Sequence, residues 1–480
     1  MRYGEILNYV GGKFTKINND HISVYCPYDG SILAEVEFAS VDLVNVAVEN
    51  ALLAQNKWKK LTYKKRTEVI FNLRDLLMKN SERLSTCIHL ENGKTIDEAN
   101  ADVLKAIELC EFAVSIPALI SGKTQFVSTG IEVREIVSPV GIVASITPFN
   151  FPLMVPMWTI PNVLVTGNAM ILKPSEKAPI TASILAEILE SAGVPEGLFT
   201  VLNGGKDIVE AICDHKDIQV VTFVGSTQIA ESVYKRSISS NKRCLALGGA
   251  KNHILVTDDI NPISVAKEIT SAAFGMGGQR CMAASVVLTI GNCEELIKEI
   301  VQISTNMVCG KDLPPLISTE NVEKIADYLK KSSGEILADG RQSKIEGDAN
   351  GYYIGPSVIL YDSYSKMPKE EVFGPTIEII KCNSLEEAIE YQNMSPYANG
   401  ASIFTESGLN ASKAIQSMSS GMLGVNIGIP VPRDPFSFGG LKSSKFGYGD
   451  ISGYDSIKLF TNIQKVTTKW DAKDKKDWAS

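Results

Sequence analysis

The chain has 480 residues, of which 44% are hydrophobic and 21% charged, a composition typical of a globular protein with about two to four domains. Its net charge of −8 argues against a nucleic-acid binder, because phosphate contacts need a basic face, but a small anionic ligand needs only a local cationic pocket. Nine cysteines without a CxxC pair and only four histidines argue against a zinc site, so we expect no metal. The same cysteines predict mostly buried thiols and a reducing, cytoplasmic location.

The first part of the chain predicts helices. A helix is expected over residues 97–114, because Thr95 places a hydroxyl, and Asp97 and Glu98 place acids, at its N-terminus. Two earlier helices are predicted by apolar residues at helical spacing, which are Leu43, Val46, Ala47 and Leu53 in the first and Ile70, Leu73 and Leu77 in the second.

A long uncharged stretch runs from Ile136 to Leu172. A membrane span needs about 20 apolar residues in one continuous helix. Prolines interrupt this stretch repeatedly, so we predict a buried strand, a turn and a helix and expect no membrane contact. The interrupting residues are Pro139, Pro148, Pro152, Pro156 and Pro161.

From about residue 140, short apolar runs alternate with helical or turn-rich segments. Strands that alternate with helices predict parallel sheets with helices on both faces, and two such series predict two α/β domains. The first series has strands at 140–147, 169–173, 199–203 and 219–225, with a helix over 180–193; the second has strands at 253–257 and 284–290, with helices over 262–273 and 293–304.

Cys281 lies in the glycine-rich segment FGMGGQRCMAAS. Glycines at 275, 277 and 278 would let the backbone approach a ligand closely. Arg280, or the start of a following helix, could favour the thiolate, which is the nucleophilic form of cysteine. The alternative is a buried structural cysteine; the glycine-rich surroundings separate Cys281 from the other eight.

Asn150 lies between two prolines in ITPFNFP, after a predicted strand. In an open α/β sheet, ligands bind beyond the carboxyl ends of the strands. An asparagine amide at that edge can donate to a developing oxyanion. The alternative is an asparagine that only hydrogen-bonds its own turn.

Lys173 and Glu176, in ILKPSEK, follow a strand and precede a helix. A carboxylate at this place can accept hydrogen bonds from ribose hydroxyls, although such a pair is also typical of a solvated surface. The GxGxxG pattern of many dinucleotide sites is absent from this region.

Taken together, the segments PFNFP, LKPSE, FVGST, GQRC and EEVFGP resemble the aldehyde dehydrogenase family over essentially the whole chain. The branch that looks most similar is the methylmalonate-semialdehyde (malonate-semialdehyde) dehydrogenases, which acylate coenzyme A. That branch is indicated by LGGAKNH (247–253), GQRCMA (278–283), GMLGVNIGIPVP (421–432) and SFGGLKSSKFG (437–447).

The resemblance implies a role for each matching residue. Cys281 would be the nucleophile, and Asn150 with the Cys281 backbone N–H would form the oxyanion hole. Arg280 would bind the carboxylate of a small anionic aldehyde. The residues implied to bind NAD are Lys173 and Glu176 at the adenosine ribose with Thr147, Phe149 and Lys177 nearby, Ser226 at the pyrophosphate, Gly248 near the nicotinamide and Glu371 at its ribose.

The resemblance also implies an α/β fold of three parts. A Rossmann-like NAD-binding domain would comprise residues 1–120 and 140–246, and an α/β catalytic domain residues 247–440. A small β oligomerisation flap, residues 121–139 and 455–470, would pair subunits into a homodimer or homotetramer.

Two departures from the family pattern bear on the reaction and the substrate. Ala246 stands where most hydrolytic members have the glutamate that activates water, which fits the CoA-acylating branch unless another carboxylate serves or the alignment is offset by one residue. Lys105 stands where the semialdehyde branch has a second substrate-binding arginine. Lysine is a point charge without the bidentate fork of arginine, and Lys105 could equally be a surface residue paired with Asp102 and Glu108.

The sequence therefore predicts an enzyme that oxidises a small anionic semialdehyde with NAD through a cysteine thioester, with coenzyme A as acyl acceptor. For a malonate-type substrate the resemblance also implies loss of carbon dioxide before transfer. The nearest alternative is a hydrolytic aldehyde dehydrogenase that releases a free acid. A binding or structural protein of the same fold is disfavoured because Cys281, Asn150 and Glu371 are all present.

Overall fold

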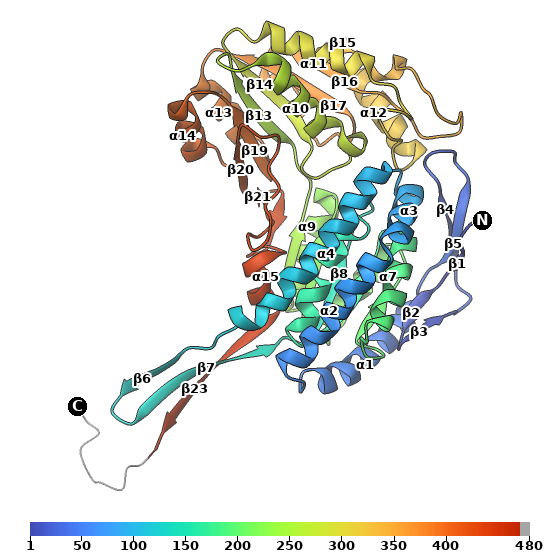
Figure 1. The fold of residues 1–480 in the computed structure, drawn as a ribbon, viewed down its shortest axis with the longest axis vertical. Coiled ribbons are helices and arrows are strands. Elements are labelled where there is room, and N and C mark those ends of the chain that lie inside the picture. Colours follow the sequence, from blue (N-terminus) through green and yellow to red (C-terminus); the bar gives the residue numbers. More distant parts are fainter. Residues whose placement is uncertain (471–480) are drawn as a thin grey trace.

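The computed structural model describes residues 1–470, in which two large sheets carry most of the chain (Figure 1). The first sheet has eight strands in the order β22-β12-β11-β8-β9-β10-β2-β3. Its five central strands are parallel, as the alternating pattern predicted, and antiparallel strands flank them. The strands are β2 (Asn8–Val10), β3 (Lys13–Thr15), β8 (Ile142–Ile146), β9 (Ala169–Lys173), β10 (Phe199–Val201), β11 (Val220–Val224), β12 (Arg243–Leu247) and β22 (Lys445–Phe446).

Helices cover this first sheet, and α4 is the longest of them (Figure 1). The Thr95 hydroxyl accepts from the Glu98 N–H while the Glu98 carboxylate accepts from the Thr95 N–H, so the predicted start of α4 is confirmed as a capping box. The helices are α1 (Val41–Trp58), α2 (Tyr63–Lys79), α3 (Ser81–Asn92), α4 (Ile96–Leu119), α7 (Ile180–Ser191), α8 (Lys206–Asp214) and α9 (Thr227–Ser239).

The apolar pattern of α1 predicted the helix but not all of its buried face. Leu43 and Ala47 are buried as expected, whereas Val46 and Leu53 are exposed. The buried stripe instead continues through Val44, Val48 and Ala51, because this side of the helix faces the sheet.

The second sheet has seven strands in the order β15-β16-β17-β14-β13-β19-β20, and all but β15 run parallel. The predicted second α/β series is thereby confirmed. The strands are β13 (Asn252–Thr257), β14 (Ala284–Ile290), β15 (Glu335–Ala338), β16 (Ser357–Tyr361), β17 (Thr376–Cys382), β19 (Gly400–Phe404) and β20 (Met422–Val425), and the helices are α10 (Pro262–Phe274), α11 (Glu294–Asn306), α12 (Thr319–Lys331), α13 (Leu385–Met394) and α14 (Gly408–Ser417).

Three small sheets complete the described fold. One projects away from the body as a flap made of β6 (Thr124–Ser128), β7 (Ile131–Pro139) and β23 (Thr461–Lys469) (Figure 1). Another lies at the edge near the N-terminus and contains β1 (Gly4–Ile6), β4 (His21–Tyr25) and β5 (Ile32–Glu37). The third small sheet is formed by β18 (Tyr397–Ala398) and β21 (Leu441–Lys442), which pair with each other, and the helix α15 (Gly453–Leu459) precedes β23.

From Ile142 the uncharged stretch is mostly buried, as predicted, whereas its first residues, Ile136 to Pro139, belong to strand β7, where Ile136 is exposed. It contains strand β8, then a turn, then the short helices α5 (Met154–Met157) and α6 (Ile160–Val165). Within residues 1–470, no helix combines the length and the apolar character that crossing a membrane would require.

Candidate active site

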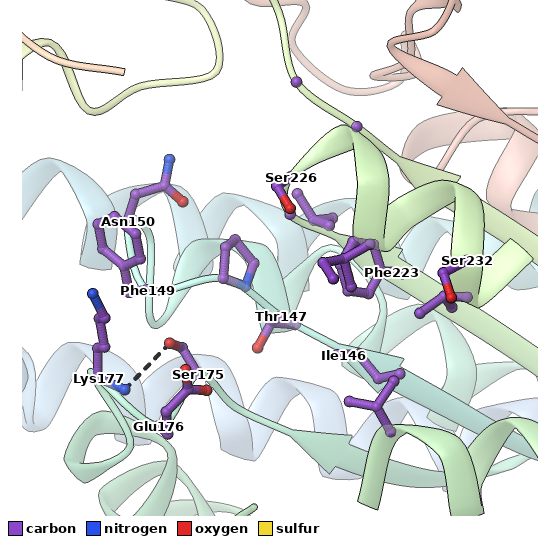
Figure 2. Close-up of a pocket in the computed structure, with 18 of the residues that line it drawn as sticks. Ile146, Thr147, Phe149, Asn150, Ser175, Glu176, Lys177, Phe223, Ser226 and Ser232 are labelled. Carbon is purple, nitrogen blue, oxygen red and sulfur yellow. Dashed lines mark hydrogen bonds between the residues drawn. The ribbon is translucent and has the colours of Figure 1, made fainter. Parts of the chain in front are cut away.

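A cleft of about 580 Å³ lies at the carboxyl ends of the parallel strands β8, β9 and β11. This is the edge at which open α/β sheets bind ligands. The cleft is lined by every residue that was predicted to act in catalysis or to bind the cofactor, and Figure 2 shows part of it. These lining residues are Thr147, Phe149, Asn150, Lys173, Glu176, Lys177, Ser226, Gly248, Cys281 and Glu371. The two residues predicted to bind the substrate, Arg280 and Lys105, do not line it.

Cys281 lies between the 3₁₀ turn η1 (Gly275–Gly278) and strand β14. The turn needs glycine for its own packing: a Cβ at Gly278 would lie 2.2 Å from the Gly374 carbonyl, and Gly278 has φ +72°. A Cβ at Gly275 would lie 2.3 Å from the Arg280 guanidinium. The close contacts of these glycines are therefore with the protein itself, and β14 follows Cys281 where a helix start had been considered.

The surroundings of the Cys281 thiol favour its protonated form. Burial, and then the negative charge of Glu371, raise the pKa of Cys281 to about 12. The backbone N–H groups of Cys281 and Met282 and the Arg280 guanidinium act in the opposite direction but do not prevail. Arg280 alone does not produce a resting thiolate, so nucleophilic attack requires that a base or a bound ligand first favour the charged form.

Asn150 is buried and reaches across to the segment that carries Cys281. Its Nδ2 donates to the Gln279 carbonyl at 3.0 Å. The alternative of an amide that bonds only its own turn is therefore wrong. An amide nitrogen carries two hydrogens, so one such bond leaves a second donor for a ligand oxygen in the cleft.

Glu371 is a partly buried acid that lines the cleft. Its Oε1 accepts from the Ala250 N–H at 3.0 Å. Burial raises the pKa of Glu371 to about 7, while the Ala250 N–H and the charge of Lys324 favour the ionised form. A Cβ at Gly249 would lie 2.5 Å from Glu371 Oε2, so the backbone there approaches the carboxyl closely.

The far end of the cleft carries polar groups suited to a sugar and phosphates. Ser226 is the N-cap of the 13-residue helix α9 and makes no side-chain capping bond, so the helix start presents donors to an anion (Figure 2). Lys173 is buried and lies 3.5 Å from Glu176, which is 43% exposed. The pair is therefore half buried, unlike a solvated surface pair.

Gly248 fits a place where backbone runs close to a neighbour. A Cβ there would lie 2.7 Å from the Ser443 carbonyl, and the next residue, Gly249, donates its N–H to the Thr227 hydroxyl at 2.9 Å. This packing brings β12, α9 and the Ser443 segment together at one wall. Among residues 1–470, no group of three or more His, Cys, Asp or Glu side chains could hold a metal ion.

The two predicted substrate cations each have a carboxylate partner. Arg280 pairs with Glu98 at 2.7 Å. Lys105 pairs with Glu108 at 2.8 Å and lies 3.9 Å from Asp434. Of the alternative surface pairing, the contact of Lys105 with Glu108 is present, whereas the contact with Asp102 is absent because the fully buried Asp102 side chain pairs with Lys94.

Sequence reasoning missed the ion pair between Lys94 and Asp102, whose Nζ and Oδ2 lie 2.6 Å apart. Both side chains are almost completely buried beside the Asn150 turn. Lys94 directly precedes the capping box, so its position in the sequence indicates only the start of a helix. No rule of helical spacing predicts that it pairs with Asp102. Lys324, on α12, was also missed; it lines the cleft near Glu371.

Comparison with known proteins agrees with this arrangement. The model of the aldehyde dehydrogenase family matches residues 14–466, which is most of the chain. The chain therefore belongs to the aldehyde dehydrogenase family, and the predicted family, fold and class of enzyme are confirmed.

Several similar proteins are named malonate- or methylmalonate-semialdehyde dehydrogenases. The chain is 38% identical to malonate-semialdehyde dehydrogenase 2 of Bacillus thuringiensis (strain Al Hakam), over 97% of this chain and 98% of the relative. A structure from Sinorhizobium meliloti 1021, described as a methylmalonate-semialdehyde dehydrogenase complexed with NAD, superimposes with a TM-score of 0.96 at 36% identity, covering 99% and 100% of the two chains. The methylmalonate-semialdehyde dehydrogenase of Oceanimonas doudoroffii gives 0.95 at 34% identity, covering 98% and 99%.

Proposed function

We propose that this protein oxidises a small anionic semialdehyde of the malonate or methylmalonate type with NAD, through a thioester on Cys281, and transfers the acyl group to coenzyme A. The observation that carries the proposal is the meeting of Cys281, Asn150 and Glu371 in one cleft whose far end suits a sugar and phosphates. The names of the similar proteins support the substrate class.

In the proposed reaction, Cys281 Sγ attacks the aldehyde carbon after losing its proton. The second N–H of Asn150 Nδ2 and the Cys281 backbone N–H then donate hydrogen bonds to the developing oxyanion. This stabilisation is strongest where water is excluded. Loss of the aldehyde hydrogen as hydride, for which bound NAD would be the acceptor, converts this intermediate into a thioester on Cys281. The thiol of coenzyme A then takes the acyl group, and the Cys281 thiol is released. Throughout these steps, the hydrogen bond from Asn150 to the Gln279 carbonyl would hold the Cys281 segment against the Asn150 turn.

The cleft has the groups that NAD would need. Ser226 and the first N–H groups of α9 would hold the pyrophosphate, with Gly248 beside the nicotinamide. Lys173 and Glu176 would bind the adenosine ribose, near Thr147, Phe149 and Lys177, and Glu371 would bind the other ribose. NAD, when bound there, supplies the acceptor for the aldehyde hydride.

The acyl acceptor follows from the residue at 246. Ala246 is fully buried on β12, opposite Phe446 of β22, and offers no carboxylate to activate water. Coenzyme A brings its own nucleophile and needs no such base at this position. The second candidate, hydrolysis to the free acid, is favoured by one observation: the pKa of Glu371, about 7, is the value that a general base needs at neutral pH.

A rapid-mixing experiment separates the two acceptors. Without coenzyme A, the enzyme with NAD and malonate semialdehyde should release one equivalent of NADH per Cys281 and then stall; coenzyme A should restore steady turnover, with an acyl-CoA identified by mass spectrometry. Rapid steady release of free acid without coenzyme A would establish hydrolysis instead. Cys281→Ala should bind NAD and give no NADH, and Ala246→Glu should gain slow hydrolysis.

The same proposal extends to the substrate, the assembly and the compartment. Arg280 and Lys105 would bind the anionic group by exchanging a carboxylate partner for it. The projecting flap, with Phe126 and Ile463 exposed, supports a homodimer or homotetramer. The nine cysteines, all free, support a reducing cytoplasm, and light scattering tests the assembly directly.

A further inference from the structure

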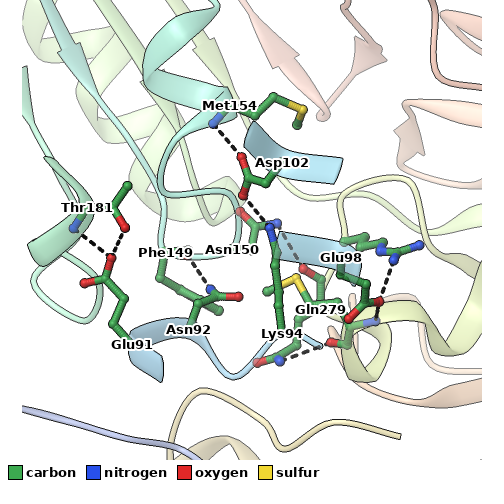
Figure 3. Close-up of polar contacts among 12 residues, drawn as sticks. Glu91, Asn92, Lys94, Glu98, Asp102, Phe149, Asn150, Met154, Thr181 and Gln279 are labelled. Atoms are coloured by element: carbon green, nitrogen blue, oxygen red, sulfur yellow. Dashed lines mark hydrogen bonds and ion pairs between the residues drawn. The ribbon is translucent and has the colours of Figure 1, made fainter. Parts of the chain in front are cut away.

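The connection between α3 and α4 holds the turn that carries Asn150. On one side of Asn150, the Asn92 amide donates to the Phe149 carbonyl at 2.7 Å. On the other side, the Met154 N–H donates to Asp102 Oδ1 at 2.7 Å (Figure 3). Backbone groups on both flanks of Asn150 are thus fixed by side chains from outside the turn.

Lys94 lies between these two contacts. Its Nζ donates to Asp102 Oδ2 at 2.6 Å and lies 3.8 Å from the centroid of the Phe151 ring, so the cation also contacts the residue after Asn150. The Lys94 side chain is 1% exposed and that of Asp102 is 0% exposed. Because apolar residues often replace such a buried pair without loss of stability, the pair is weak evidence for a role in stability and directs attention to what it positions.

The same helix start also holds the segment that carries the nucleophile. Glu98 Oε1 accepts from the Met276 N–H at 2.6 Å and from Arg280 Nη2 at 2.7 Å (Figure 3). Glu98 Oε2 accepts from the Thr95 N–H in the capping box. The first turns of α4 therefore fix both ends of the 3.0 Å bond from Asn150 to Gln279.

We propose that Lys94 and Asp102 are positioning residues, which hold the Asn150 amide where the oxyanion forms. This rests on the proposed function, in which Asn150 is the oxyanion donor. A displacement of about 1 Å in a catalytic group can cost two orders of magnitude in rate, so loss of the pair acts on kcat rather than on substrate binding.

A double-mutant cycle tests the proposal. Lys94→Met should lower kcat by about 10- to 100-fold with little change in the KM for the aldehyde or the Kd for NAD. In the Asn150→Ala background the same substitution should cost less than about threefold, because the donor it positions is already absent. Equal losses in the two backgrounds, or no loss in either, overturn the proposal. Failure of the proposed function is distinct: Asn150→Ala alone would then leave kcat within about tenfold.

Two further variants keep the test decisive. Asp102→Asn retains an oxygen for the Met154 N–H but removes the charge, and it replaces Lys94→Met in the cycle if that variant does not fold. Glu91→Gln is the matched control: this buried acid, next to Asn92, accepts from the Ile180 and Thr181 N–H groups at the start of α7. Figure 3 shows its contact with Thr181, which lies away from the Asn150 turn. It should lower Tm and leave kcat unchanged. A loss of kcat in Glu91→Gln equal to that of Lys94→Met would show general loosening and overturn the proposal.

Discussion

Asn150 is bonded directly to the segment of the nucleophile: its Nδ2 donates to the carbonyl of Gln279, two residues before Cys281, at 3.0 Å. Asn150 follows a strand of the first sheet and Cys281 precedes a strand of the second. This one bond therefore joins the two large sheets at the reacting centre, where a donor and a nucleophile must keep a fixed separation.

Replacing Asn150 with alanine should lower kcat by about 100- to 1000-fold, the usual cost of losing one oxyanion donor. The thiol should stay reactive, because the substitution removes no group that shifts the pKa of Cys281. Steady-state NADH formation measures the first effect and the rate of iodoacetamide labelling the second. If kcat fell by less than about tenfold, the Asn150 amide would not face the oxyanion.

Alkylation of Cys281 should report the charge on Glu371. Since the pKa of Cys281 is raised to about 12, the labelling rate of the free enzyme should rise about tenfold per pH unit above about pH 8, where Glu371 is ionised, without a plateau up to pH 10. Glu371→Gln removes a negative charge that raises this pKa, so labelling at pH 8.5 should become about tenfold faster. Below pH 6 wild-type Glu371, with its pKa near 7, is itself protonated, and the two proteins should converge. An unchanged rate at pH 8.5 contradicts the coupling.

The sequence predicted the supporting sheets and the residues at their edges, because both follow from local pattern. Apolar runs between helical segments give β8, β9 and β11, and a residue placed just after a parallel strand, such as Asn150 or Ser226, must lie at the ligand-binding edge. The start of α4 was predicted for the same reason, from the Thr95 hydroxyl and the acids Asp97 and Glu98, and the structure adds the reciprocal capping box between Thr95 and Glu98.

The contacts of the charged residues could not be predicted in this way. Helical spacing suggested that Lys105 reaches Asp102, but the spacing does not say which side of α4 is buried. Burial determines the partners. The buried Asp102 pairs with Lys94, whereas Lys105, near the surface, pairs with Glu108 and lies close to Asp434, which belongs to a loop distant in sequence. The raised pKa of Cys281 likewise depends on desolvation and on Glu371, which no motif records.

NAD should be preferred over NADP. Glu176, 43% exposed at the mouth of the cleft, would face a 2′-phosphate with like charge, although Lys173 at 3.5 Å and Lys177 reduce the repulsion. Glu176→Gln should raise the ratio of kcat/KM for NADP to that for NAD by about three- to tenfold, since the pair is partly screened by solvent. Similar kcat/KM values for both cofactors in the wild-type enzyme would show that Glu176 does not select between them.

Substitutions at Lys105 and Asp434 should change the KM for an anionic aldehyde in opposite directions. Lys105 already has Glu108 at 2.8 Å and Asp434 at 3.9 Å, and Asp434 Oδ1 is buried without a hydrogen-bond partner. Burial raises the pKa of Asp434, while the charge of Lys105 favours its ionised form, so this carboxylate depends on the cation and competes with a substrate carboxylate for it. Lys105→Ala should raise the KM about tenfold, and Asp434→Asn should lower it.

The specificity of these effects is the decisive measurement. A neutral aldehyde of the same length should keep its KM within about twofold in both variants, because it makes no charge contact with Lys105. Lys105→Arg should improve a malonate-type substrate by adding the bidentate fork. Lys65→Ala, which breaks an exposed pair with Glu68 at the same helical spacing, is the matched control and should change neither KM. If Lys105→Ala changes the KM for charged and neutral aldehydes alike, or changes neither, then Lys105 pairs only with the carboxylates of the protein. The inference that this lysine binds an anionic substrate would then be wrong.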